Sequence, residues 1–215
     1  SSAACAASPA GGGCRAVSWP RAWVGVSVAV RFRSRRGRLN GGLPVVSTDT
    51  DDGRLAFARL VHADATVRVD ENVVDKVANL CEDEGAAVVI EATGHPEAIP
   101  TAFALARPGG RVILLGSTRG ETEQVNFYRD VHKKGLTVVG AHNSARPQHD
   151  SYPGWWVAQD DGRVALKLMA LGRLAVRPLV THSFAWQEAP QAYERLKQWD
   201  TSTLGMILDW ERSRT

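Results

Sequence analysis

The sequence predicts an α/β fold built on a doubly wound parallel sheet, and two observations lead to this prediction. From Leu43 onward, short apolar runs alternate with amphipathic stretches, which is the pattern of a parallel sheet with helices on its faces. Several of these runs are apolar at consecutive positions, as strands buried on both faces require. The expected strands are 43–48, 65–69, 86–90, 111–115 and 136–139, with helices expected at 52–61, 71–83 and 96–106.

The third expected helix ends at Pro108-Gly109-Gly110, which turns the chain into the next strand. A different pattern begins near His142. The expected elements there are a polar loop at 142–155, a helix at 157–171, a strand-like run from Leu179, a helix whose apolar residues run from Ala189 to Leu196, and a last apolar run at 204–210. We therefore divide the chain into three segments, residues 1–42, 43–173 and 174–215.

The first 42 residues differ in kind from the rest. Their low-complexity opening predicts disorder, and the alternation from Val24 to Phe32 predicts one half-buried strand. The residues after that strand cannot form an amphipathic helix, so we expect the sheet to be incomplete at its N-terminal strand.

Charge is also unevenly distributed. The chain before Asp49 contains seven arginines and no lysine or acid (+7), while the remainder carries −4, which together give the net charge of +3. Two interpretations stay open: a basic arm that binds nucleic acid or lipid phosphates, or an out-of-frame reading of a GC-rich gene. We favour the second, because Lys and acids are absent while the spacing to Asp49 is kept.

Composition narrows the class of protein. An apolar content of 44% and a charged content of 23% are typical of a globular protein. No apolar run reaches the ~18 residues that a membrane span needs. The first ten residues lack the features of a secretory signal, and three cysteines cannot form a disulfide framework, so the expected location is the cytoplasm.

Asp49 is the last residue of the strand-like run PVVSTD, and an acid at this position suggests a binding role. In a dinucleotide-binding fold, an acid at the end of the second strand accepts hydrogen bonds from the adenosine ribose. It also repels the 2′-phosphate of NADP and so favours NAD. An alternative stays open, in which Asp49 caps the following helix, although Asp51 and Asp52 could do so as well.

Three strand ends carry small residues that allow close backbone approach, at Thr93-Gly94, Gly116-Ser117 and Gly140-Ala141. Ligands of doubly wound sheets bind outside the carboxyl ends of the strands, near the point where strand order reverses. Glycine at one such end is ordinary turn chemistry, but three ends in series favour a cofactor trough.

The sequence VVIEATGHPEAIPTAFALARPGGRVILLGS, followed by KKGLTVVGAHNS and RPLVTHSFAWQEAPQAYE, resembles the zinc-dependent medium-chain alcohol dehydrogenases, most closely the polyol (sorbitol-like) and threonine dehydrogenases. The resemblance runs from about Gly42 to Trp210. It implies a Rossmann-like coenzyme-binding domain, hydride transfer between an alcohol and NAD, and a small-molecule substrate. It implies that the adenosine ribose is held by Asp49 and Arg54. By the same resemblance, the trough is lined by Thr93, Leu115, Gly116 and Ser117, and the nicotinamide lies beside Ala141, His142 and Asn143.

The chain also departs from this family. The three glycines of the phosphate-binding fingerprint would fall near Gly25, Ser27 and Val30, of which only the first is glycine. Gly205 stands where the family usually has Lys or Arg. We expect this chain to lack the zinc domain that the family places first, and we expect His142, His149 and Asp150 to be solvated loop residues rather than metal ligands.

We expect no catalytic residue in this chain, and we expect the chain to be impaired or inactive as a catalyst. Residues 174–215 correspond to the segment that packs on the catalytic domain in the family. The runs 179–184 and 204–210 should then lose their sheet partners and expose apolar surface. The alternatives are a non-catalytic nucleotide- or partner-binding module and, more weakly, nucleic-acid binding through the arginines. The family also pairs subunits through edge strands, so a homo-oligomer formed through residues 136–140 is a further expectation. The sequence does not identify the alcohol.

Overall fold

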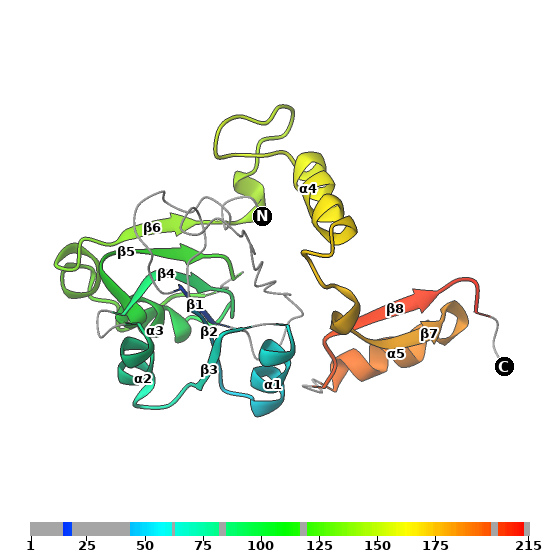
Figure 1. The fold of residues 1–215 in the computed structure, drawn as a ribbon, viewed down its shortest axis with the longest axis horizontal. Helices are drawn as coiled ribbons and strands as arrows, with labels where there is room; N and C mark the ends of the chain where they lie inside the picture. Colours follow the sequence, from blue (N-terminus) through cyan, green and yellow to red (C-terminus); the bar gives the residue numbers. More distant parts are fainter. Residues whose placement is uncertain are drawn as a thin grey trace.

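The computed structural model describes residues 15–18 (backbone only), 44–61, 63–81, 85–116, 120–198 and 202–212. Within them, six strands form one parallel sheet in the order β3-β2-β1-β4-β5-β6 (Figure 1). The strands are β1 (Arg15–Ser18), β2 (Val45–Asp49), β3 (Ala65–Arg68), β4 (Ala86–Glu91), β5 (Ala106–Leu114) and β6 (Thr137–Gly140). Strand order reverses at β1, so a topological switch point lies between β1 and β4. The predicted doubly wound parallel sheet is confirmed.

The helices between these strands are α1 (Asp52–Leu60), α2 (Val73–Leu80) and α3 (Ala98–Leu105). Val73 and Val77 are buried one turn apart on α2, which fixes the face that the helix turns to the sheet. The chain passes from β2 to β3 in the opposite direction to its passage from β4 to β5. Because such crossovers are right-handed, α1 covers one face of the sheet while α2 and α3 cover the other.

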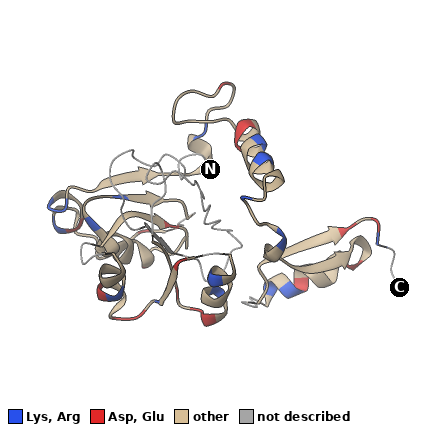
Figure 2. Ribbon diagram, in the orientation of Figure 1, with Lys and Arg blue, Asp and Glu red and all other residues tan. Residues whose placement is uncertain are grey.

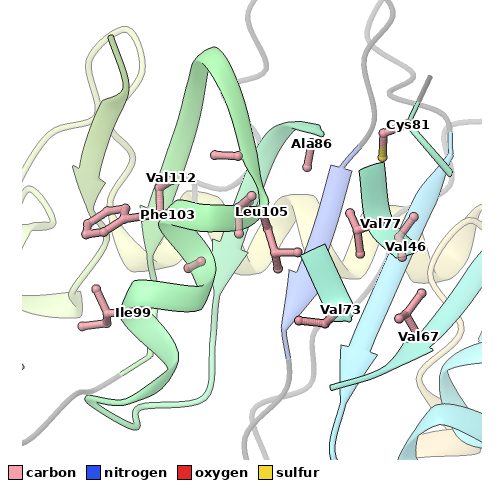
Figure 3. Close-up of a cluster of buried hydrophobic side chains, with 13 residues drawn as sticks. Val46, Val67, Val73, Val77, Cys81, Ala86, Ile99, Phe103, Leu105 and Val112 are labelled. Atoms are coloured by element: carbon pink, nitrogen blue, oxygen red, sulfur yellow. The ribbon is translucent and has the colours of Figure 1, made fainter. Parts of the chain in front are cut away.

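The apolar core lies between the sheet and the pair α2 and α3 (Figure 3). Val46, Val89 and Val112 come from three strands and are fully buried, and Phe103 of α3 packs in the same cluster. Strands β2, β4 and β5 therefore carry apolar side chains into a closed interior, as the sequence pattern predicts.

Cys81 follows α2, is buried at the edge of the core and is disulfide-bonded. One disulfide is not the framework of several bridges that the cysteine count argued against, so that interpretation is not contradicted. The cytoplasmic location stays a prediction, which this disulfide does not favour.

The first strand lies further upstream than the sequence predicts. β1 consists of Arg15–Ser18 and pairs with both β2 and β4, which makes it a central strand of the sheet. It belongs to the N-terminal segment, residues 1–42, and four paired residues do not test whether that segment is disordered or an out-of-frame reading, so this stays a prediction. The predicted strand at 24–32 lies outside the described residues, as does the low-complexity opening.

A second difference concerns the turn at residues 108–110, which falls within the bounds of β5. The pairing of β4 with β5 shifts between Ala86↔Ala106 and Val88↔Arg111, so the irregular segment interrupts the ladder between these two pairs. Gly109 has a φ of 68°, a conformation that glycine adopts without strain. The turn chemistry predicts the bend correctly, but the strand extends on both sides of it.

Beyond β5 the chain forms short helical segments, η2 (Tyr128–His132, before β6), η3 (Asn143–Ala145), η4 (Arg177–Leu179) and η5 (Trp186–Glu188), together with α4 (Ala158–Ala170) and α5 (Ala189–Lys197). The two last strands, β7 (Val180–Ala185) and β8 (Gly205–Asp209), pair in parallel as a separate sheet (Figure 1). They therefore pair with each other, whereas we expected both runs to lack a sheet partner.

The expected apolar exposure of this unit is confirmed. Trp186 and Trp210 stack with ring centroids 5.3 Å apart, yet 43% and 72% of their surfaces remain exposed. Ile207 of β8 is 47% exposed. A two-stranded sheet cannot bury both of its faces, so these side chains form an uncovered apolar surface.

Charges of both signs are mixed on the C-terminal helices (Figure 2). On α4, Arg163 pairs with Asp160, and on α5, Lys197 pairs with Glu194. These helices therefore present ion pairs to solvent rather than a surface of one sign. No helix in the described ranges is long and apolar enough to cross a membrane.

Candidate dinucleotide site

The carboxyl ends of β2 and β4 flank the switch point of the sheet. Ser18 of β1 pairs with Thr48 on one side and with Glu91 on the other. Asp49, the residue after Thr48, and the turn after Glu91 therefore lie at the same edge of the sheet, one strand apart on either side of β1. A dinucleotide crosses a doubly wound sheet at such a point.

Asp49 is almost fully buried at the end of β2, with 2% of its surface exposed. One carboxylate oxygen, Oδ1, accepts a hydrogen bond of 2.9 Å from the backbone N–H of Asp51. The other, Oδ2, is buried and has no hydrogen-bond partner among the described residues. It lies 4.0 Å from the Nη1 atom of Arg54, which is too far for a hydrogen bond.

The electrostatic environment of Asp49 follows from this geometry. Burial raises the pKa of its carboxyl from 3.8 to about 6, while the Asp51 N–H and the Arg54 guanidinium act in the opposite direction. At neutral pH the group is therefore mostly ionised, with one oxygen free to accept hydrogen bonds. This arrangement suits a ligand that offers hydroxyl donors.

The helix that follows β2 is capped by a different acid. Asp51 has the extended backbone of an N-cap, and its side chain accepts a hydrogen bond of 2.9 Å from the N–H of Arg54. The alternative that Asp49 caps α1 is therefore wrong, because Asp51 occupies that position. The Asp49 side chain is therefore not needed as the cap of α1.

Thr93 is held at the end of β4 by Glu91, a residue that was not among the predicted site residues. Glu91 is fully buried, and its Oε1 atom accepts hydrogen bonds from both the backbone N–H (2.6 Å) and the hydroxyl of Thr93. The Thr93 hydroxyl in turn accepts a hydrogen bond of 3.0 Å from the N–H of His95. The only signal in the sequence is an acid directly after an apolar strand, the same signal that singled out Asp49.

Leu115 and Gly116 follow β5 and are tied to β4. Both of their N–H groups donate to the backbone oxygen of Glu91, at 2.8 and 2.9 Å. A Cβ atom on Gly116 would lie 2.4 Å from the backbone nitrogen of Gly94, closer than any real contact. Glycine is required here because the turns after β4 and β5 touch each other, which is the turn-chemistry explanation that the sequence left open beside a cofactor trough. Ser117 lies outside the described residues.

Ala141, His142 and Asn143 follow β6, which is next to β5 in the sheet. Ala141 is buried, and its N–H donates to the oxygen of Leu114 at 2.9 Å. His142 and Asn143 are exposed, and His142 caps the short helix η3 through its Nδ1 atom, which accepts from the N–H of Ser144 at 3.2 Å. Apart from Arg54, which lies in α1, the predicted site residues that the structure describes thus lie at the carboxyl ends of β2, β4, β5 and β6.

Zinc does not fit the described part of the chain. No three side chains of His, Cys, Asp or Glu are grouped there in a way that could hold a metal ion. His142, His149 and Asp150 are all exposed in the loop after β6.

Gly205 stands at the position where the family usually has Lys or Arg. It cannot carry a side chain without a clash, because a Cβ atom would lie 2.6 Å from the oxygen of Leu179.

The chain is similar to known dehydrogenases in sequence and in fold. It is 28% identical over 162 residues to L-threonine 3-dehydrogenase of Bacillus licheniformis, a match that covers 75% of this chain and 43% of that protein. Among solved structures, benzyl alcohol dehydrogenase from Acinetobacter calcoaceticus superposes with a TM-score of 0.72 at 20% identity, over 96% of this chain and 52% of the other. An alcohol dehydrogenase from Escherichia coli in complex with NADH superposes with a TM-score of 0.69 at 17% identity, over 91% and 52%.

The chain thus spans about half the length of these relatives. At this level of identity the structural matches establish the fold. A family model described as zinc-binding dehydrogenase matches residues 38–156, which is more than half of the chain and includes all four strand ends described above. The chain belongs to the zinc-binding dehydrogenase family.

Proposed function

We propose that this chain binds NAD and serves as the coenzyme-binding half of an oxidoreductase that transfers hydride between a small alcohol and NAD. The observation that carries the proposal is the free Oδ2 atom of Asp49, which is buried at the end of β2, one strand from the switch point, without a hydrogen-bond partner among the described residues. Leaving such an atom unpaired costs about 1–3 kcal/mol. Ribose hydroxyls would remove that cost by donating hydrogen bonds to it.

The residues present fit the dinucleotide on the adenosine side. The Asp49 carboxylate matches the pair of ribose hydroxyls, and Arg54 lies close enough to contact the same sugar or the adenine. NADP carries a phosphate on one of these hydroxyls, and the negative charge of Asp49 would repel it. We therefore propose NAD rather than NADP as the coenzyme.

The contribution of this chain to a reaction would be binding and orientation. NAD supplies the hydride acceptor when it is bound. The turns after β4, β5 and β6 would hold the nicotinamide, and the substrate would contact groups that the described residues do not supply. The described residues offer no group of ligands that could hold zinc.

Titration with NADH tests the proposal. Replacing Asp49 by alanine (D49A) should weaken binding about 10- to 100-fold, because a charge-assisted hydrogen bond contributes roughly 1.5–3 kcal/mol. Asp49→Asn should bind NADH more weakly than the wild type, and the preference for NADH over NADPH should shrink. Asp52→Asn is the matched control, since Asp52 is an exposed acid at the start of the same helix and pairs with Arg68 at 2.7 Å.

Two outcomes would count against the proposal. Absence of NADH binding by the wild type would overturn it, and so would equal effects of Asp49→Ala and Asp52→Asn. Binding of NADH without alcohol-dependent reduction of NAD would instead support a non-catalytic nucleotide-binding module. Salt-dependent binding of an oligonucleotide that is lost on deletion of residues 1–42 would point to the arginine-rich segment.

We also propose that two copies associate through β6. This strand pairs only with β5 among the described strands and so forms one edge of the sheet, with Val138 39% exposed. An open edge offers unpaired backbone groups to another strand. Sedimentation of the purified chain tests this proposal, which a monomer at all accessible concentrations would contradict.

A further inference from the structure

Glu91 is a fully buried acid that none of the sequence motifs explains. It is the last residue of β4 and stands beside β1, on the side of the switch point away from Asp49. We propose that Glu91 is a positioning residue that shapes the nicotinamide half of the dinucleotide site by holding together the turns after β4 and β5. The inference rests on the proposed function, because it assigns a task within the same site.

One residue ties both turns through different atoms. The side-chain Oε1 atom accepts from the N–H and the hydroxyl of Thr93, which fixes the turn after β4. The backbone oxygen accepts from the N–H groups of Leu115 and Gly116, which fixes the turn after β5. Thr93, Leu115 and Gly116 are three of the residues that the resemblance to the family predicts to line the cofactor trough.

The packing of the two turns makes the side chain of Glu91 a spacer. Gly116 has no room for a Cβ atom, which would lie 2.4 Å from the nitrogen of Gly94 and 2.8 Å from the Oε2 atom of Glu91. Gly94 itself has a φ of 70°, so the turn after β4 also depends on glycine. The carboxyl group therefore lies in contact with the point where the two backbones meet, and its removal would leave a void beneath them.

Stability alone does not account for this acid. Its Oε2 atom is buried and has no hydrogen-bond partner among the described residues, which is unfavourable for folding. A valine or isoleucine would fill an apolar interior at lower cost, as at Val89 in the same strand. Only a hydrogen-bond acceptor at this position can orient the N–H and the hydroxyl of Thr93, and this orientation sets the shape of the turn.

Two ligands, one that occupies half of the site and one that occupies all of it, distinguish this role from a general structural one. In a doubly wound sheet, one half binds the adenosine nucleotide and the other binds the nicotinamide nucleotide. ADP occupies only the first half, which contains Asp49. NADH needs both halves, so loss of the turn geometry should weaken NADH binding and leave ADP binding unchanged.

The experiment measures the affinities of the full chain for NADH and ADP by calorimetry. For Glu91→Ala we expect NADH binding to weaken about 10- to 100-fold, as for loss of charge-assisted hydrogen bonds, with ADP binding unchanged. Glu91→Gln should retain near wild-type NADH binding, because its amide oxygen can accept both hydrogen bonds from Thr93. Amide hydrogen exchange at Thr93 and Gly116 should become faster in Glu91→Ala and stay slow in Glu91→Gln.

A second variant covers the case in which Glu91→Ala fails to fold. Thr93→Val keeps the shape of the side chain but removes the hydroxyl, so NADH binding should weaken several-fold while ADP binding stays the same. Unchanged NADH binding in both Glu91→Ala and Thr93→Val would overturn the positioning role, as would an equal loss of NADH and ADP. Failure of the wild type to bind either ligand would instead overturn the proposed function.

Discussion

The buried carboxyl of Asp49 leads to a prediction about the pH dependence of stability. Its pKa is about 6 in the folded protein and 3.8 when it is freely solvated, and burial is the main cause of the increase. The folded state therefore binds this proton more tightly than the unfolded state does. Stability from this group is fully present below pH 3.8 and is lost as the pH rises through about 6.

The size of the effect follows from the two pKa values. Each pKa unit corresponds to about 1.36 kcal/mol, so the difference between 3.8 and about 6 lowers the free energy of unfolding by about 3 kcal/mol at neutral pH. Asp49→Asn cannot titrate, and its amide oxygen can still accept the hydrogen bond from the Asp51 N–H. The variant should therefore gain stability relative to the wild type as the pH rises from about 4 to about 7, by about 2–3 kcal/mol in total.

Urea unfolding followed by circular dichroism, at several pH values in this range, measures the difference between the two proteins. Taking the difference cancels the titration of all other groups. Asp70→Asn serves as the control, because its hydrogen bond from Lys76 lowers the pKa of the Asp70 carboxyl, so its contribution is lost on acidification. A stability difference between Asp49→Asn and the wild type that does not change with pH would refute the reasoning.

Three further predictions concern the surrounding structure. Gly116→Ala should lower the free energy of unfolding by about 1–3 kcal/mol, because the new Cβ meets the backbone of Gly94 at 2.4 Å. Gly140→Ala, whose Cβ meets nothing within 4 Å, is its control in urea unfolding, and equal effects would contradict this explanation. Lys134→Met should lower the Tm by removing the hydrogen bonds from Nζ to the oxygens of Phe103 (2.8 Å) and Ala104 (3.1 Å) at the end of α3, a loss of roughly 1–2 kcal/mol. An unchanged Tm would show that water replaces the ammonium there. Val138→Lys should shift any dimer toward monomer in sedimentation, since a charge on an edge strand opposes strand pairing, and an unchanged dimer would place the interface elsewhere.

Three of the six strands of the main sheet could be predicted closely from the sequence, whereas β1 was missed and β5 begins earlier than expected. The expected runs 65–69, 86–90 and 136–139 correspond to β3, β4 and β6 within one residue at each end. Of these, β4 is a central strand, and burial on both faces explains its continuous apolar run. β3 and β6 are edge strands, and their β-branched residues make them recognisable in the sequence. Helix α1 was also recognisable, because its acids lie at the N-terminus, although the choice of cap between Asp49 and Asp51 needed the structure.

What the sequence could not show depends on contacts between distant residues. Glu91 has the same local signal as Asp49, an acid after an apolar run, and only the contacts with Thr93, Leu115 and Gly116 distinguish a positioning role. The pairing of β7 with β8 was missed for a related reason. Each run alone has the pattern of a strand, but the choice of partner is made by tertiary contacts.

Several buried polar atoms that have no partner among the described residues are gathered at one place in this fold. Thr48 Oγ1, Asp49 Oδ2 and Glu91 Oε2 all lie at the carboxyl ends of β2 and β4, and Arg54 Nη1 lies beside them. Each such atom costs about 1–3 kcal/mol, and packing alone would favour apolar side chains at these positions. These unpaired atoms lie on both sides of β1, which is where a doubly wound sheet binds its ligand. The two carboxylates then have different tasks, since Asp49 keeps an oxygen for the ligand while Glu91 uses its own to shape the turn that the ligand would meet.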